Sequence, residues 1–298
     1  MDGVIAGAPA ADVAGQVSLS ILVQRLLTDP SSPLPAAKLP VLKEAAIAAC
    51  DANDGVTDRV IVDPAQCTFD PAATQCTTAD TSACLTASEV SVARRLYAGV
   101  VNSRTGERVY PGASVAGEPG TAPFASNFSI GTSHMRYAVL ENPSWDPFSF
   151  DFDSDIDSIR RADGGRSAAM DTAISAFTAR GGKLLLYHGT TDGLAPHQNT
   201  IEYYRGIEEK LGPAARDHVR LFLVPGMDHC RGGEGAQDVD YIGALEQWAE
   251  AGLAPDRLLA RRAGAAPFTR PVCAYPAVPT YGGDGDPADA ANWECVVK

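Results

Sequence analysis

Two short apolar runs in the second half of the chain stand out against a polar background. Residues 183–187 (Lys-Leu-Leu-Leu-Tyr) and 220–224 (Arg-Leu-Phe-Leu-Val) are compact enough to predict two buried strands. Residues 3–9 predict a third short strand, and the apolar residues between Val13 and Leu27 favour a helix. Further helices are predicted at 171–180, 198–211 and 238–251.

The alternation of strands and helices predicts an α/β fold around a mostly parallel sheet. Three strands are too few for a free-standing sheet of this type, because its strands need interior neighbours, so only part of a fold is expected. From about residue 36 to residue 165 the composition changes. This segment contains four cysteines, clustered Asp and Gly/Pro-rich stretches, which is typical of an insertion held together by disulfides. We assign residues 1–35 and 166–298 to the core and 36–165 to an inserted lid; after residue 251 we expect a turn-rich, cysteine-bracketed tail.

Length and charge narrow the functional classes. The 298 residues suffice for one large α/β domain or for a core with an inserted second domain. The net charge of −13 argues against binding to nucleic acid or to anionic membrane surfaces, both of which would repel the chain. No apolar stretch approaches the roughly 20 residues that span a bilayer. A small organic substrate is therefore the favoured partner.

Seven cysteines point to an oxidising compartment outside the cytosol. Six of them form close pairs in loop-like sequence, each able to close a short loop: Cys50 with Cys67, Cys76 with Cys84, and Cys273 with Cys295. Cys230 is left over, which suggests a missing partner. The first ten residues lack the basic segment of a signal peptide, so we expect a secreted or periplasmic protein whose signal peptide is not in this chain.

Each of the two apolar runs delivers polar residues at its carboxyl end. Asp192 follows the first run and His229 follows the second. In α/β-hydrolases the triad comes in the order Ser, Asp or Glu, His, with the Ser on a G-x-S-x-G turn. The order fits an acid and a base, although no G-x-S-x-G occurs in the chain. The alternative, equally open on these residues, is a turn opened by Asp192 and an ordinary loop histidine.

The segment between Cys50 and Cys67 is rich in carboxylates. Asp51, Asp54 and Asp58 would repel one another if they converged, and a hard oxygen-seeking ion such as Ca²⁺ relieves that repulsion. The loop is not an EF-hand, because no Glu closes it. The alternative is a solvated acidic turn after a helix, which these residues alone slightly favour.

Zinc is a poorer fit to the histidines. His188, His197 and His229 lie close in sequence, but their spacing matches no H-E-x-x-H or Cys/His ligand pattern. We therefore do not predict a zinc site.

Several segments, taken in order, resemble the tannase and feruloyl esterase family of α/β-hydrolases, which includes a mono(hydroxyethyl) terephthalate hydrolase. The resemblance runs nearly end to end, through the segments 2–10, 50–58, 145–146, 181–189, 226–230 and 270–276, together with Asp192. It implies that Asp192 is the triad acid, His229 the base and His188 a substrate-binding residue. It further implies a structural calcium ion bound in the lid by Asp51, Asp54, Asp58 and the carbonyls of Val56 and Val60. The three cysteine pairs named above are disulfides in the family.

The resemblance also accounts for Cys230. Family members carry Cys-Ser in the nucleophile elbow, and that cysteine bonds the cysteine after the catalytic histidine. The elbow lies a little upstream of the segment 2–10, so the chain is expected to be truncated before its nucleophile. Two departures bear on substrate choice: Thr190 and Thr191 stand where many members have an aromatic residue, and Tyr110 to Phe124 lacks a Trp often found in the pocket.

Together these observations predict a serine carboxylic ester hydrolase acting on aromatic, phenolic esters, with this chain alone inactive for want of the serine. A rival hypothesis is a non-catalytic, calcium-binding pseudoenzyme or small-molecule-binding protein. A third possibility is that Ser18 or Ser20 has been recruited as nucleophile, although neither has flanking glycines.

Overall fold

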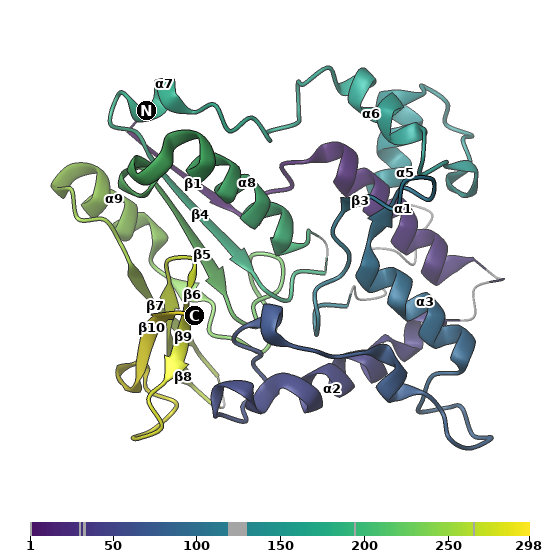
Figure 1. Ribbon diagram of the computed structural model, residues 1–298, viewed down its shortest axis with the longest axis horizontal. Helices are drawn as coiled ribbons and strands as arrows, with labels where there is room; N and C mark the ends of the chain where they lie inside the picture. Colours follow the sequence, from purple (N-terminus) through teal and green to yellow (C-terminus); the bar gives the residue numbers. More distant parts are fainter. Residues whose placement is uncertain (1, 30, 32–33, 119–129, 194, 265) are drawn as a thin grey trace.

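A small parallel sheet and a layer of helices form the two main parts of the molecule (Figure 1). The computed structural model describes residues 2–29, 31, 34–118, 130–193, 195–264 and 266–298. The stretch from Tyr110 to Phe124, in which the family's Trp is lacking, therefore lies partly outside the described residues. Within these ranges no helix combines the length and apolarity needed to cross a bilayer.

The sheet consists of three parallel strands in the order β1-β4-β5. They are β1 (Gly3–Gly7), β4 (Lys183–Gly189) and β5 (Val219–Val224). These are the strands that the apolar runs predict. Because the strands are parallel, their carboxyl ends and the loops that follow meet at one edge of the sheet.

Side chains of β4 alternate between two apolar layers, as the period of a strand requires. Leu184 and Leu186 pack with Tyr204 of helix α8 (His197–Leu211) on one face. Leu185 belongs to a second cluster that includes Leu245 of helix α9 (Tyr241–Ala251). Each face of the sheet is thus covered by one helix, as a parallel sheet requires.

The helical layer is built around α1 (Val13–Thr28) and contains the other long helices of the first half of the chain. Its other elements are α2 (Leu39–Cys50), α3 (Ala87–Ala98), β2 (Val100–Val101), β3 (Arg108–Tyr110), α5 (Ile130–His134) and α6 (Asp155–Asp163). The apolar side chains of α1 share one core cluster with Leu42, Leu96 and Ile159 of this layer. The side chains of α1 therefore pack within the helical layer, although the expected division assigned residues 1–35 to the core.

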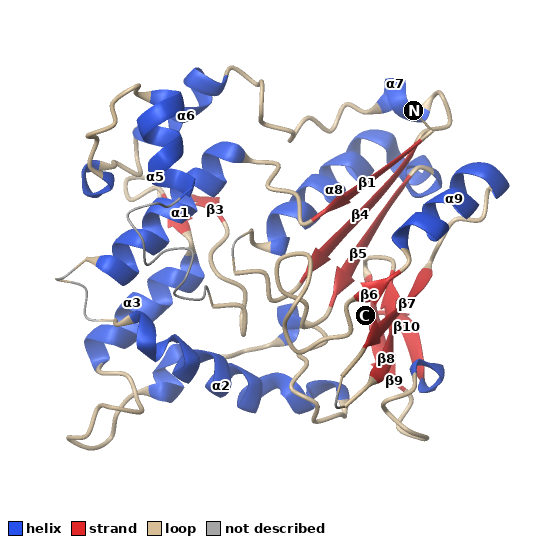
Figure 2. Cartoon of the chain, turned by 180° about the vertical axis from the view of Figure 1, so that it is seen from behind, coloured by secondary structure: helices blue, strands red, loops and turns tan. Residues whose placement is uncertain are grey.

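The segment after α9 is more regular than the turn-rich tail expected from the sequence (Figure 2). It forms β7 (Arg257–Arg262) and β8 (Phe268–Cys273) in one antiparallel sheet, and β9 (Ala277–Tyr281) with β10 (Trp293–Val297) in another. Strand β6 (Asp238–Val239), which comes just before α9, pairs with β7. In β7 only Leu258 and Ala260 are buried. A strand that buries only a leucine and an alanine among arginines and an exposed leucine is a weak periodic signal in the sequence.

The helix predicted at 171–180 is reduced to α7 (Ser175–Thr178). Asp171 accepts a hydrogen bond from the backbone N–H of Ala173, at 2.8 Å. Such local side-chain bonds offer the backbone an alternative to helix, so the helical segment begins only after this turn.

All three predicted disulfides are confirmed. The Cα atoms are 5.4 Å apart in Cys50–Cys67, 5.0 Å in Cys76–Cys84 and 5.6 Å in Cys273–Cys295. Cys230 is exposed and is a free cysteine in the described part of the chain.

Candidate active site

The loops that follow β4 and β5 are tied together by hydrogen bonds. Thr190 accepts a bond from the N–H of Gly226 through its hydroxyl, at 2.9 Å. The N–H of Thr191 donates to the carbonyl of Met227 at 3.1 Å, and its hydroxyl donates to Asp228 Oδ1 at 2.9 Å. The two threonines that we noted as departures from the family pattern thus hold the two loops in register.

Gly189 allows this close approach. A β-carbon at this position would lie 2.1 Å from the carbonyl oxygen of Met227 and 2.4 Å from that of Asp228. Any side chain would push the β5 loop away from the β4 loop, because backbone atoms cannot move aside as a flexible side chain does.

Asp192 and His229 are brought into contact by these loops, as the sequence predicts. His229 Nδ1 lies 2.7 Å from Asp192 Oδ2. The Asp192 side chain is fully buried, whereas the His229 side chain is 42% exposed. The hydrogen bond with Asp192 raises the pKa of His229 above its usual value, against a smaller opposing effect of burial.

Asp192 is held by several donors. Its Oδ2 also lies 3.1 Å from His188 Nε2, and its Oδ1 accepts a hydrogen bond from the N–H of Ala195 at 2.9 Å. Burial by itself would raise the pKa of Asp192, but the bonds from His188, His229 and Ala195 outweigh it and keep the pKa below its usual range. The site therefore holds a stable carboxylate in a dry position.

His188 does not lie where a substrate would reach it. Its side chain is fully buried, and its ring nitrogens contact Asp192, the Ala195 carbonyl and the Thr200 hydroxyl. The role of substrate-binding residue implied by the resemblance is at odds with this burial. The donors from Ala195 and Thr200 were missed by sequence reasoning, although Thr200 lies three residues from His197 and four from Tyr204 on the buried face of α8.

The structure provides no serine hydrogen-bonded to His229 within the described residues. Ser18 is fully buried inside α1, and its hydroxyl donates to the Ala14 carbonyl at 2.7 Å. The hydroxyl of Ser20 accepts a bond from the N–H of Gly131 at 3.1 Å. Both serines are helix residues engaged in packing of the lid, which disfavours their recruitment as nucleophiles.

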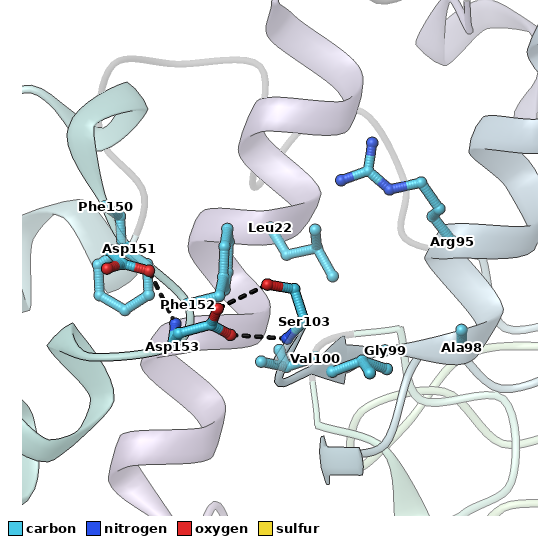
Figure 3. A pocket seen from close by; sticks show the side chains of 11 residues that line it. Leu22, Arg95, Ala98, Gly99, Val100, Ser103, Phe150, Asp151, Phe152 and Asp153 are labelled. Atoms are coloured by element: carbon cyan, nitrogen blue, oxygen red, sulfur yellow. Dashed lines mark hydrogen bonds between the residues drawn. The ribbon is translucent and has the colours of Figure 1, made fainter. Parts of the chain in front are cut away.

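A cavity of about 400 Å³ lies elsewhere, between α1, the end of α3 and the segment 150–153 (Figure 3). Its walls include Leu22, Phe150 and Phe152, with Arg95 at one side. Asp153 closes one side by accepting bonds from the N–H and hydroxyl of Ser103, both at 2.6 Å. Neither Asp192 nor His229 lines this cavity, so it is separate from the candidate catalytic pair.

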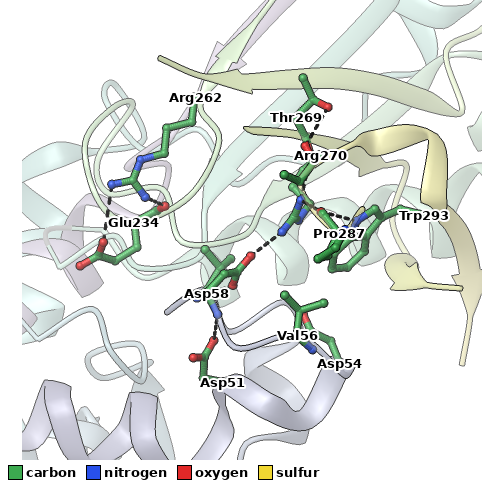
Figure 4. Close-up of polar contacts among 12 residues, drawn as sticks. Asp51, Asp54, Val56, Asp58, Glu234, Arg262, Thr269, Arg270, Pro287 and Trp293 are labelled. Carbon is green, nitrogen blue, oxygen red and sulfur yellow. Dashed lines mark hydrogen bonds and ion pairs between the residues drawn. The ribbon is translucent and has the colours of Figure 1, made fainter. Parts of the chain in front are cut away.

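The predicted calcium loop folds into a compact turn beside the C-terminal sheets (Figure 4). Asp54 Oδ1 accepts a bond from the N–H of Val56 at 2.9 Å, and Asp58 Oδ1 accepts one from Val60 at 3.0 Å. Asp58 Oδ2 forms an ion pair with Arg270. Asp54 Oδ2 is buried without a hydrogen-bond partner. Burial, reinforced by Asp58 and Asp51, raises the pKa of Asp54 to about 6.

The donor chemistry of this loop suits a calcium ion, because the buried oxygen of Asp54 lacks a donor and two more carboxylates stand nearby. The geometry is less complete. Among the described residues no three acidic, histidine or cysteine side chains are gathered closely enough to hold a metal ion. Asp58 is instead neutralised by Arg270, a contact that the sequence did not reveal.

Comparison with known proteins gives a consistent result. The sequence profile of the family described as "Tannase and feruloyl esterase" matches residues 1–129 and 117–296. An uncharacterized esterase of Xanthomonas campestris is 32% identical over 351 residues, which cover 99% of this chain and 61% of that protein. A mono(2-hydroxyethyl) terephthalate hydrolase of Piscinibacter sakaiensis is also 32% identical, over 99% of this chain and 59% of its own length.

The solved structures agree with the sequence comparison. The crystal structure of feruloyl esterase B from Aspergillus oryzae superimposes with a TM-score of 0.89 at 25% identity, and covers 99% of this chain and 64% of that one. The chain thus spans about three fifths of the length of the curated relatives it matches.

Proposed function

This chain belongs to the tannase and feruloyl esterase family. We propose that it is part of a carboxylic ester hydrolase that acts on aromatic, phenolic esters by Ser-His-Asp acyl transfer. The observation that carries the proposal is the 2.7 Å contact between His229 Nδ1 and the fully buried Asp192 carboxylate. A mono(2-hydroxyethyl) terephthalate hydrolase and a feruloyl esterase among the relatives support an aromatic acyl group.

His229 is the general base in this proposal. Its Nδ1–H donates to Asp192, which leaves Nε2 free to take the proton of an attacking serine hydroxyl. The serine oxygen bonds to the ester carbonyl carbon, the alcohol leaves with the proton from His229, and water then releases the acid by the same route. Asp192 keeps the ring in the correct tautomer and stabilises the imidazolium that forms.

The serine is not among the described residues that contact His229. We propose that it lies in sequence corresponding to the part of the relatives that this chain does not span. Cys230, next to the base, would then bond the cysteine beside that serine.

The test compares hydrolysis of methyl ferulate, methyl gallate and p-nitrophenyl acetate by two proteins. One is the chain itself, and the other is a fusion in which the unmatched part of the Xanthomonas relative is added to it. We expect turnover only by the fusion, and its loss on His229→Ala. Turnover by the chain alone would refute the account of the serine, and its loss on Ser18→Ala or Ser20→Ala would identify a recruited nucleophile. A folded fusion that is inactive, or indifferent to His229→Ala, would leave the non-catalytic binding protein as the better account.

A structural calcium ion is proposed as well, bound by Asp51, Asp54, Asp58 and the carbonyls of Val56 and Val60. The support is the unpartnered buried oxygen of Asp54 and the closure of the loop by Cys50–Cys67. A bound ion would neutralise the loop and stiffen it; its chemistry is structural, so no step of hydrolysis passes through it.

We also propose that the protein works in an oxidising compartment, either secreted or periplasmic. Three disulfides support this, because such bonds persist mainly outside the reducing cytosol. Mass analysis of protein recovered from the native host, with and without alkylation, would detect the bonds if they form there.

A further inference from the structure

One carboxylate oxygen in the candidate active site is shared by two imidazole rings. Asp192 Oδ2 lies 2.7 Å from Nδ1 of His229 and 3.1 Å from Nε2 of His188. His229 faces the exterior, whereas His188 is fully buried behind the carboxylate. The His229 ring therefore approaches this oxygen from the solvent side, and the His188 ring approaches it from the buried side.

The surroundings of His188 determine which of its nitrogens carries hydrogen. Nε2 faces two oxygen acceptors, Asp192 Oδ2 and the Ala195 carbonyl at 2.8 Å, so Nε2 is the donor. Nδ1 lies 2.8 Å from the hydroxyl of Thr200 on α8, which is then the donor to Nδ1. A chain of hydrogen bonds thus runs from helix α8 through His188 to Asp192.

We propose that His188 is a positioning residue, which holds the Asp192 carboxylate in the orientation that aims Oδ2 at His229. The proposal deepens the proposed function, on which its catalytic part rests. Asp192 hangs from a loop, and its carboxylate can rotate about its last side-chain bond unless donors hold both oxygens. Ala195 holds Oδ1, and His188, fixed by strand β4 and by Thr200, holds Oδ2.

Losing the His188 donor has a definite expected consequence. Without His188 the carboxylate loses one of the donors that fix its orientation in a dry site, so it can turn and its contact with His229 lengthens. His229 then loses part of the interaction that raises its pKa. The titratable groups that face the pair from other elements include His197 on α8, whose ring lies 6.5 Å from that of His188, Tyr110 on β3 and Asp228 on the neighbouring loop.

Two matched substitutions separate the donor role from simple packing. In His188→Gln the side-chain amide nitrogen can reach the place of Nε2 and still donate to Asp192. In His188→Asn the amide is one methylene shorter, matches Nδ1 and cannot reach Asp192. The two variants leave a similarly polar group in the same buried place, so damage to packing should be similar in both.

The primary measurement is the titration of His229 by nuclear magnetic resonance in histidine-labelled protein, with His229→Ala used to assign the signal. It needs no hydrolysis, so it stands even if no ester is cleaved. We expect the pKa of His229 to fall toward its ordinary value in His188→Asn and to stay near that of the wild type in His188→Gln.

Three results would overturn the proposal. They are an unchanged pKa of His229 in His188→Asn, a rise in that variant, and an equal fall in both variants. If His188→Asn does not fold, Thr200→Val and Thr200→Ser repeat the comparison one bond further away. Valine removes the hydroxyl that holds His188, and serine keeps it.

Kinetics tests the catalytic part in whichever form of the protein hydrolyses esters. We expect His188→Asn to lower kcat by about 10- to 100-fold with little change in KM, because misplacement of a catalytic group by about 1 Å has effects of this size. His188→Gln should recover most of kcat. The expected pKa contrast with no hydrolysis in any form would reject the proposed function while leaving the positioning of Asp192 intact.

Discussion

Asp192, after β4, and Asp54, in the acidic loop, each have carboxylate oxygens buried from water, but their pKa values shift in opposite directions. Asp192 is fully buried, yet donors on both oxygens keep its pKa below the usual range. Asp54 has one satisfied oxygen and one buried oxygen without a partner, and its pKa rises to about 6. Burial is unfavourable to the charge in both; the number of donors decides the outcome.

The difference shows which of the two carboxylates the chain itself provides with enough hydrogen-bond donors. Strand β4 supplies His188 to one carboxylate, and the loops after β4 and β5 supply the Ala195 N–H and His229. The acidic loop gathers negative charge, and its cationic partner Arg270 bonds Asp58. The first region is organised for a reaction, and the second has a residual charge that a calcium ion would neutralise.

The largest expected effect comes from Asp192→Asn in a hydrolysing form of the protein. Asparagine keeps the shape but offers an N–H where the ring needs an acceptor, so the wrong tautomer is favoured. We expect kcat to fall by about 10³- to 10⁴-fold, as for the equivalent change in serine proteases. Asp228→Asn, on the neighbouring loop, is the control and should have a much smaller effect. Similar losses in the two variants would mean that Asp192 has no special role.

Arg270→Met tests what holds the acidic loop to the C-terminal sheets. The guanidinium pairs with Asp58 and lies 4.2 Å from the ring centroid of Trp293. Removing one partner of a buried pair costs roughly 3–5 kcal/mol, and we expect about 2–4 kcal/mol because the Asp58 side chain is 21% exposed.

The control is Arg94→Met, whose pair with Asp70 is more than half exposed on both sides. An exposed pair contributes little to stability, because solvent screens both charges. Chemical unfolding measures both free energies, and equal losses would contradict the structural role given to Arg270.

Calcium titration tests whether the acidic loop binds an ion that compensates for the donors it lacks relative to Asp192. We expect calcium to raise the midpoint of thermal unfolding, by the equivalent of roughly 2.7 kcal/mol at a free concentration 100 times its dissociation constant. Asp54→Asn should abolish the response. Asp80→Asn, in the loop closed by Cys76–Cys84, should keep it. An equal response in both variants would place the ion elsewhere.

The smallest expected effect is the pH dependence of the Asp192–His229 contact. The folded pKa of His229 is raised above the unfolded value of about 6.5, so its stabilisation is fully present below that pH and is lost as pH rises through the folded pKa. A double-mutant cycle of Asp192→Asn and His229→Gln should therefore give a larger coupling at pH 5.5 than at pH 8.5. A coupling that is larger at pH 8.5 would reverse the assigned protonation.

Much of the sheet can be predicted from the chain because local pattern and burial agree there. The apolar runs at 183–187 and 220–224 lie within β4 and β5, and α8 covers the predicted helix 198–211. Parallel strands place their carboxyl ends at one edge, so the meeting of Asp192 and His229 follows from topology. The strands after α9 were missed; in β7, for example, the exposed Leu259 between the buried Leu258 and Ala260 hides the alternation.

The sequence by itself determined which segments form the parallel sheet, which polar residues end its strands and, through family resemblance, which cysteines pair. Only the tertiary structure showed that α1 packs in the helical layer, that His188 contacts Asp192 and that Arg270 pairs with Asp58 across 212 residues. The physical reason is that a sequence pattern reports on neighbouring residues, whereas most of these contacts join residues far apart in the chain. Periodicity records which face of an element is buried, whereas the partner that a buried polar group finds depends on how distant elements pack.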